Sequence, residues 1–139
     1  MSLFLLDTDH LTLYHMGHPP LLQNLLRHLA DELAISVVTV EEQLTGWQRA
    51  LRQARDDVRR AQIYERMART VEGLAGWRVI PLSASALARH ATLIRQRLNV
   101  PSNDLKIAAT ALEENATVVT RNLRDFRRVP GLQCEDWTV

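Results

Sequence analysis

The chain is poor in the residues that build disulfides, zinc sites and membrane spans. Its single cysteine, Cys134, cannot form an internal disulfide, and no Cys or His spacing suggests a zinc site. No apolar run approaches the roughly 20 residues that cross a bilayer. The first ten residues, MSLFLLDTDH, lack the basic segment of a signal peptide. These absences argue against export and membrane association, and they favour the cytoplasm.

Charge of one sign is not in excess either. The net charge is +1, so the totals indicate no strongly basic surface that would attract nucleic acid over a long range. Lysine is nearly missing, since Lys106 is the only one, and arginine supplies the other positive side chains. A guanidinium group can hold a phosphate through two hydrogen bonds. The balance of charge permits a nucleic-acid substrate without requiring one.

Length and composition are those of an ordinary folded domain. The 139 residues are 46% hydrophobic and 24% charged, close to the average for globular proteins, so disorder is not favoured. A chain of this length buries roughly two-thirds of its unfolded surface. Repeats, low-complexity tracts and linkers are absent from the sequence, and we therefore expect residues 1–139 to form a single domain.

Short apolar runs predict buried parallel strands. The clearest are residues 3–7, 34–40 and 117–120, which lack the alternation of a half-exposed strand. Weaker candidates are residues 78–81 and 133–137. Helical patterns separate the runs, so βαβ units and an α/β fold are the natural account.

Helices are expected over residues 19–30 and 83–98, and from Pro101 and Ser102 onward. Between Val40 and Leu74, apolar residues recur at a three-four spacing. That spacing predicts one long helix or a hairpin of two, the second capped by Asp56 or Asp57. We name as the hairpin stripe the residues Leu44, Trp47, Leu51, Ala54 and Val58. The stripe would be a docking groove, a homodimer seam or ordinary core packing.

Four carboxylates are placed where strand ends or helix starts would bring them to one edge of the sheet. They are Asp7, Glu42, Asp104 and Asp125. Each taken alone has a common explanation, as a helix cap, a favourable charge in a first helical turn or a surface acid. Four acids gathered at one point would repel one another unless a divalent cation lay among them. Their joint placement therefore predicts a metal site.

The donor set points to a hard metal. Oxygen ligands without cysteine or a histidine cluster suit Mg²⁺ or Mn²⁺ rather than zinc, and the implied chemistry is phosphoryl transfer. The five histidines are scattered along the sequence, and only His10, beside the expected cleft, is a candidate for a role there.

These motifs resemble those of the PIN-domain nucleases, and among them the VapC-like toxins of type II toxin–antitoxin systems. The resemblance spans essentially the whole chain in the right order. It rests on LLDTDHL, ISVVTVEEQLTGW, NDLKIAATALE and TRNLRDFRRVPGLQCEDW. It implies a three-layer α/β/α sandwich with a mainly parallel sheet of four or five strands, in agreement with the pattern of strands and helices above.

The resemblance also implies roles for the acids. Asp7, Glu42 and Asp104 match the family's metal-coordinating residues, and Asp125 matches its fourth acid. Glu42 is preferred over its neighbour because the family's acid stands four residues before a glycine, here Gly46. The family often has asparagine where this chain has Asp9, which adds a fifth charge whose role is open.

The function that this resemblance implies is metal-dependent hydrolysis of RNA. A Mg²⁺ or Mn²⁺ ion would acidify a water for attack on a phosphodiester, with Asp125 placing that water or a second ion. Residues near the acids that would hold substrate phosphates are Lys106, Thr120, Arg121 and Asn122, although an ordinary surface explains them as well. Expected partners are the RNA, a small antitoxin and a second copy of the chain.

Two other functions fit some of these residues. LFLLDTDHLT is similar to the DxDxT motif of haloacid-dehalogenase-like phosphatases, which would make Asp7 a nucleophile. The motif's usual glycine is His10 here, and no later Asp-Asp pair follows an apolar strand. A non-catalytic module that binds RNA or a partner is the second alternative, disfavoured by the presence of all four acids.

Overall fold

The computed structural model describes residues 2–139 and has a five-stranded parallel sheet at its centre. Every pair of neighbouring strands runs parallel. In spatial order the strands are β3 (Arg78–Ile80), β2 (Glu32–Ser36), β1 (Leu3–Leu6), β4 (Thr117–Val119) and β5 (Cys134–Glu135). All five strands expected from the sequence are present, and the predicted α/β class is confirmed.

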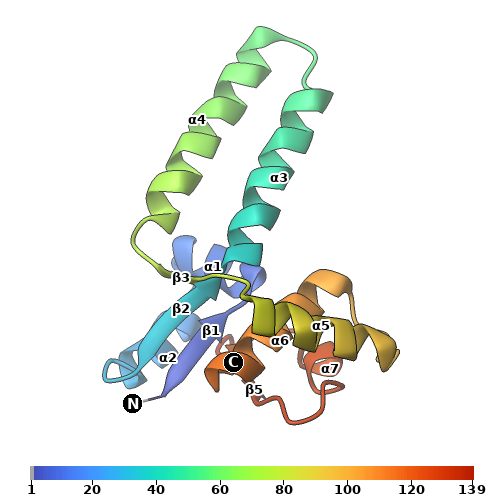
Figure 1. Ribbon diagram of the computed structural model, residues 1–139. Helices are drawn as coiled ribbons and strands as arrows, with labels where there is room; N and C mark the ends of the chain where they lie inside the picture. The colour runs from blue at the N-terminus through green and yellow to red at the C-terminus, as the bar shows by residue number, and fades with distance from the viewer. Residues whose placement is uncertain (1) are drawn as a thin grey trace.

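Within residues 2–139, seven helices surround the sheet or extend from it. Figure 1 shows their arrangement. They are α1 (Thr8–His15), α2 (Pro19–Arg27), α3 (Val37–Gln53), α4 (Asp57–Leu74), α5 (Ala84–Arg95), α6 (Ser102–Glu114) and α7 (Leu123–Phe126). Among residues 2–139, no helix combines the length and the apolar character that crossing a membrane requires.

Two apolar clusters, one on each face of the sheet, hold the helices in place. Leu5, Ala34 and Val118 pack in one cluster with residues of α5, α6 and α7. Their chain neighbours point the opposite way, so that Leu6 and Val119 pack in the second cluster with α1 and α2. Helices on both faces of a parallel sheet make the three-layer sandwich that the resemblance to PIN-domain nucleases implies.

One strand prediction was wrong at its end. Residues 34–40 were expected to be one strand, but β2 ends at Ser36 and Val37–Val40 form the first turn of α3. The buried Ser36 hydroxyl accepts the Val38 backbone N–H at 3.0 Å and thereby caps the new helix. A run of β-branched residues fits a strand or a buried helix turn equally well in sequence, and here the cap decides.

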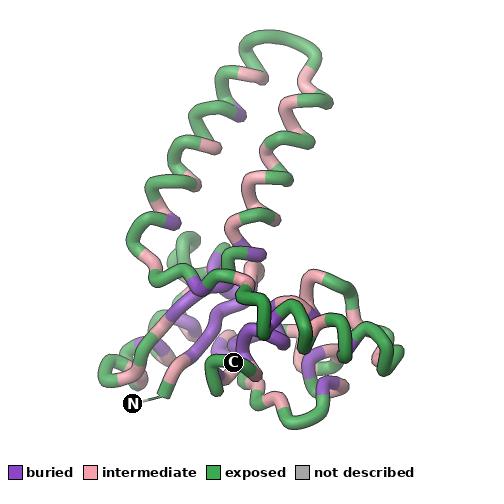
Figure 2. The backbone as a smooth tube through the Cα atoms, in the orientation of Figure 1, coloured by how far each residue is buried: buried purple, intermediate pink, exposed green. Residues whose placement is uncertain are grey.

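The segment between Val40 and Leu74 is a hairpin of two helices, α3 and α4, that projects from the sheet (Figure 1). Asp56 caps α4 by accepting the Arg59 N–H at 2.8 Å. Trp47 donates its indole N–H to Thr70 across the seam at 2.8 Å. Figure 2 shows this arm mostly exposed or half-buried, while most of the buried segments lie in the body beneath it, above all in the sheet. The hairpin stripe lies half-buried in the seam, except Val58, which is exposed.

Candidate active site

Asp7 lies where β1 ends and α1 begins, at the carboxyl edge of the sheet. Its backbone N–H donates to Val119 at 3.0 Å, which ties it to the neighbouring β4. Its side-chain Oδ1 accepts the His10 N–H at 2.9 Å and caps α1. The residue is only 8% exposed. Asp7 is therefore both a helix cap and a carboxylate fixed at this edge.

Glu42 comes to the same place from the second turn of α3. The hydroxyl of Thr8 lies 3.3 Å from its Oε1 and 3.1 Å from the hydroxyl of Thr39. Burial raises the pKa of Glu42, the Thr8 hydrogen bond lowers it, and the charges of Asp7 and Glu41 raise it further. Glu42 is half-buried while Glu41 is exposed, which agrees with the preference for Glu42.

Asp104 links all four predicted acids. It is the third residue of α6 and is half-buried. Burial first, and then the charges of Glu42, Asp7 and Asp125, raise the pKa of Asp104 to about 6. The four acids therefore lie close enough together for their charges to interact. This mutual repulsion is the electrostatic signature expected of a cation site.

Asp125 lies on the short helix α7. Its two carboxylate oxygens have different partners. Asn122 donates to Oδ2 at 2.8 Å, and Arg128 donates to Oδ1 at 3.2 Å. These contacts place and partly neutralise the carboxylate, which distinguishes Asp125 from the other three acids.

The four residues predicted to hold phosphate have different surroundings. Thr120 is fully buried, and its hydroxyl accepts the Asn122 backbone N–H at 2.9 Å. The Asn122 side chain is engaged by Asp125, and Lys106 lies half-buried on α6. Arg121 is exposed and forms two hydrogen bonds with Asp9, at 2.6 and 2.9 Å. The open question about Asp9 thus has a structural answer, because its carboxylate pairs with Arg121.

The donor chemistry of the site fits a divalent cation. Within residues 2–139, no three His, Cys, Asp or Glu side chains stand close enough to form a ready-made metal cage. The acids nevertheless crowd one another, and a cation among oxygen ligands relieves such repulsion. One buried polar atom also lies beside Asp7 without a hydrogen-bond partner, the Nδ1 of His10. In donor type and charge, these carboxylates fit a hard divalent cation.

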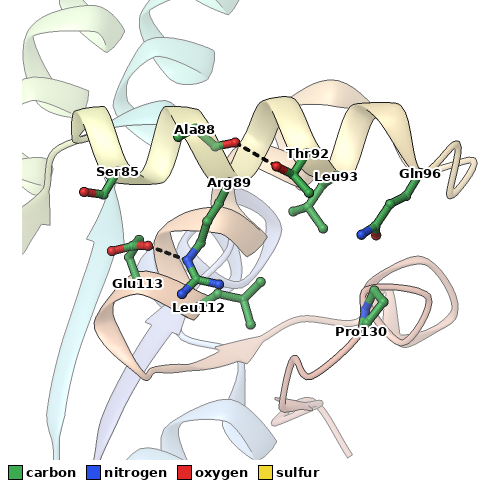
Figure 3. Close-up of a pocket in the computed structure, with 9 residues that line it drawn as sticks. All are labelled: Ser85, Ala88, Arg89, Thr92, Leu93, Gln96, Leu112, Glu113 and Pro130. Carbon is green, nitrogen blue, oxygen red and sulfur yellow. Dashed lines mark hydrogen bonds and ion pairs between the residues drawn. The ribbon is translucent and has the colours of Figure 1, made fainter.

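Two hollows differ in their relation to these acids. One of about 550 Å³ lies between α5 and α6, where Arg89 and Glu113 form an ion pair (Figure 3). None of the four acids lines it. The other, about 320 Å³, is lined by Glu41, Glu42, Thr45, Gly46, Arg49 and Asn103. The second hollow brings a carboxylate of the site together with an arginine.

Two parts of the site were not found from the sequence. Thr8 contacts Glu42 through its hydroxyl group and Thr39 contacts Thr8, and the only signal was the Asp-Thr pair that begins with Asp7. The buried contact of His10 with Trp137 joins residues 127 positions apart. No local pattern of residues encodes such a distant pair.

A parallel α/β sandwich with acids gathered at the carboxyl ends of its strands defines a class of nuclease-like domains. The sequence model of the PIN domain family matches residues 5–132, and the chain belongs to that family.

The relatives of the chain carry the same name in different bacteria. It is 27% identical over 143 residues to ribonuclease VapC1 of Haemophilus influenzae (strain R2866), covering 98% of each chain. It is 28% identical over 142 residues to the tRNA(fMet)-specific endonuclease VapC of Salmonella typhimurium, covering 99% of each. The solved structure of VapBC2 from Rickettsia felis, bound to a promoter DNA fragment, matches with a TM-score of 0.71 and 27% identity. That match covers 98% of this chain and 99% of the other.

The raised pKa of Asp104 predicts a stability that depends on pH. A carboxyl group with a raised folded-state pKa binds its proton more tightly in the folded protein, so ionisation destabilises the fold as pH rises from about 3.8 through about 6. We expect Asp104→Asn to raise the free energy of unfolding of metal-free protein at pH 8. The gain should be about 1 kcal/mol, since partial exposure screens the repulsion. Below pH 3.8 it should vanish. Urea denaturation in EDTA measures both.

Glu72→Gln is the control for this experiment, because Glu72 is exposed on α4. Removing the Glu72 charge should leave the free energy of unfolding within about 0.5 kcal/mol of the wild-type value, both at pH 8 and below pH 3.8. If Asp104→Asn is stabilised relative to wild type no more at pH 8 than below pH 3.8, the pKa of Asp104 is not raised by burial and the neighbouring acids in the folded protein.

The Asp9–Arg121 pair predicts a gain of affinity when it is broken. Asp9→Asn should release the Arg121 guanidinium for a phosphate, and RNA should then bind more tightly at low salt. An exposed pair of this kind is worth up to about 1 kcal/mol, or roughly fivefold in affinity. Fluorescence anisotropy with a labelled RNA, in a Glu42→Gln background that prevents cleavage, measures the effect. Adding Arg121→Gln to Asp9→Asn should remove the gain in RNA affinity. If Asp9→Asn binds RNA no more tightly than the Glu42→Gln protein alone, breaking the pair does not free Arg121 for a phosphate.

Proposed function

We propose that this protein is a metal-dependent endoribonuclease, the toxin of a type II toxin–antitoxin pair. The observation that supports this most directly is the convergence of Asp7, Glu42, Asp104 and Asp125 at the carboxyl edge of the sheet, in a chain of the PIN domain family. The relatives named as ribonucleases and a tRNA endonuclease point to RNA as the substrate class. A structured RNA such as tRNA is the first substrate to test.

The proposed metal is Mg²⁺ or Mn²⁺. PIN-domain nucleases generally depend on divalent metal, and in this chain Asp7, Glu42 and Asp104 would hold it, with Asp125 completing the acidic site. When bound, such an ion acidifies a water and offsets the charge that develops on the phosphate during hydrolysis. Thr8, the residue after Asp7, holds Glu42 through its hydrogen bond to Oε1. Asn122 and Arg128 hold Asp125 from both sides.

The groups proposed to meet the RNA backbone surround the acids. Arg49 lines the hollow beside Glu42 and can pair with a phosphate. The α6 N-terminus follows Pro101, which makes no side-chain cap hydrogen bond, so its first amides are free to face an anion. Lys106 on α6 and Arg121 after β4 add positive charge. Thr120 and Asn122 would act by shaping the loop that carries Arg121.

The proposed protein partner is a small antitoxin whose segment covers the cleft. A groove of about 480 Å³ between α1 and the hairpin reaches Glu42 and is lined in part by Met16, Trp47 and Ala50. A peptide with an apolar side chain would fit this groove and would block the acids next to it. Homodimer formation and a cytoplasmic location are also parts of the proposal.

The competing functions are weakened to different degrees. Membership of the PIN domain family over residues 5–132 sets aside the phosphatase in which Asp7 would be a nucleophile. A non-catalytic module remains distinguishable by experiment, because it would bind RNA without cleaving it.

Adjacent acids on α3 provide a matched test of the activity. Losing an outer-shell partner of a metal ligand costs roughly 10- to 100-fold in activity. Glu42→Gln removes a proposed ligand itself, so it should reduce Mn²⁺-dependent RNA cleavage by roughly 100-fold or more. Glu41→Gln removes the same charge from the exposed neighbour; since Glu41 lines the hollow beside Glu42 without being proposed as a metal ligand, its cleavage should fall much less than that of Glu42→Gln. Single-turnover cleavage of a tRNA transcript measures both rates. When expressed in a bacterial host, Glu41→Gln should arrest growth and Glu42→Gln should allow normal growth.

Equal loss of cleavage in the two variants would contradict the assigned role of Glu42. Intact RNA after prolonged incubation with wild-type protein and Mn²⁺, despite measurable RNA binding, would favour the non-catalytic module.

A further inference from the structure

His10 is a buried histidine that connects the acidic site to the end of the described chain. Its side chain is completely inaccessible to solvent. On one side, its Nε2 accepts the backbone N–H of Trp137 at 3.3 Å. On the other, its Nδ1 lies 3.5 Å from Oδ1 of Asp7 and has no hydrogen-bond partner. Within residues 2–139, no other buried side-chain nitrogen or oxygen lacks one.

The contact with Trp137 fixes which ring nitrogen carries the hydrogen. A backbone N–H can only donate, so Nε2 must be the acceptor and the neutral ring must carry its hydrogen on Nδ1. Asp136 also lies near Nε2, at 3.7 Å, but its Oδ1 already accepts the Thr138 N–H at 2.8 Å. The remaining donor of the ring therefore faces Asp7.

The residue that fixes the ring is itself held firmly. Trp137 is 3% exposed, and its indole stacks on His28 with centroids 4.4 Å apart. Asn24 donates to its carbonyl oxygen at 2.9 Å, and Glu135 accepts its indole N–H at 3.0 Å. These contacts leave the backbone N–H of Trp137 little freedom to turn away from His10.

The backbone N–H and the ring Nδ1 of His10 both face the same oxygen of Asp7. The backbone N–H donates to Oδ1 at 2.9 Å, and Nδ1 approaches Oδ1 at 3.5 Å, slightly too far for a hydrogen bond. Neither contact uses Oδ2. A second donor on one carboxylate oxygen fixes the orientation of the group, as the partners behind metal ligands do.

We propose that His10 is a positioning residue for the metal site, held in its Nδ1–H form by the amide of Trp137. It completes its hydrogen bond to Asp7 Oδ1 when the acids draw together around a divalent cation. This inference rests on the proposed function, because it requires the cation site.

Two amide variants separate the two contacts of the ring. His10→Asn places an amide where Nδ1 stands, so it keeps a donor for Asp7 and loses the acceptor for Trp137. His10→Gln places its amide where Nε2 stands, so it keeps the acceptor for Trp137 and loses the donor for Asp7. Mn²⁺ affinity is measured from the electron paramagnetic resonance signal of free Mn²⁺. Stability is measured as the melting temperature in EDTA.

Mn²⁺ affinity and melting temperature should rank the two variants in opposite order. His10→Gln should bind Mn²⁺ about 10-fold more weakly than wild type, the cost expected for losing an outer-shell partner. His10→Asn should bind Mn²⁺ more tightly than His10→Gln. In EDTA, however, His10→Asn should melt at a lower temperature than His10→Gln. If His10 served only to fill the core, affinity and melting temperature would fall together.

A measurement on wild-type protein covers the case in which a variant does not fold. Nitrogen-15 NMR of the imidazole should show hydrogen on Nδ1 and none on Nε2, and Mg²⁺ should shift the Nδ1–H proton downfield as its hydrogen bond forms. A hydrogen on Nε2, or a proton signal unaffected by saturating Mg²⁺, would overturn the inference. Equal Mn²⁺ affinity of wild type and His10→Gln would overturn it while leaving the nuclease intact. Wild-type protein that binds no Mn²⁺ would overturn the metal site as well.

Discussion

Repulsion between carboxylates is the constraint on which the site depends. The parallel sheet ends its strands at one edge, and the elements that follow bring Asp7, Glu42, Asp104 and Asp125 to that edge. Burial and the neighbouring acids raise the pKa of Asp104 to about 6, so the folded chain holds an unfavourable concentration of negative charge. A protein keeps such an arrangement when a ligand of opposite charge repays its cost on binding.

The surroundings of the acids reduce this repulsion without removing it. Asp7 and Glu42 each accept a hydrogen bond from a residue at the start of α1, and Asp125 is held by Arg128. Asp9 brings further negative charge close to the site, but Arg121 pairs with it. The acids that remain least compensated are the ones proposed to hold the metal.

Local patterns in the sequence were sufficient for the α/β class and for placing the acids at one edge of the sheet, since a buried strand ends in an acid or an acid begins a helix. The three layers were implied by the resemblance to PIN-domain nucleases. The boundary of β2 was wrong because Val37–Val40 suit either structure, and only the cap at Ser36 distinguishes them. The partners of Asp9 and His10 lie 112 and 127 positions away, so their pairing depends on the complete fold.

The most direct test is calorimetry of Mn²⁺ binding to wild-type protein in buffers of different ionisation enthalpy, which counts the protons released. A carboxyl group with a pKa of about 6 must lose its proton to bind metal, so binding should release protons at pH 5.5 and almost none at pH 8. Binding with no proton release at either pH, or no binding at all, would contradict the claim that these acids share one cation.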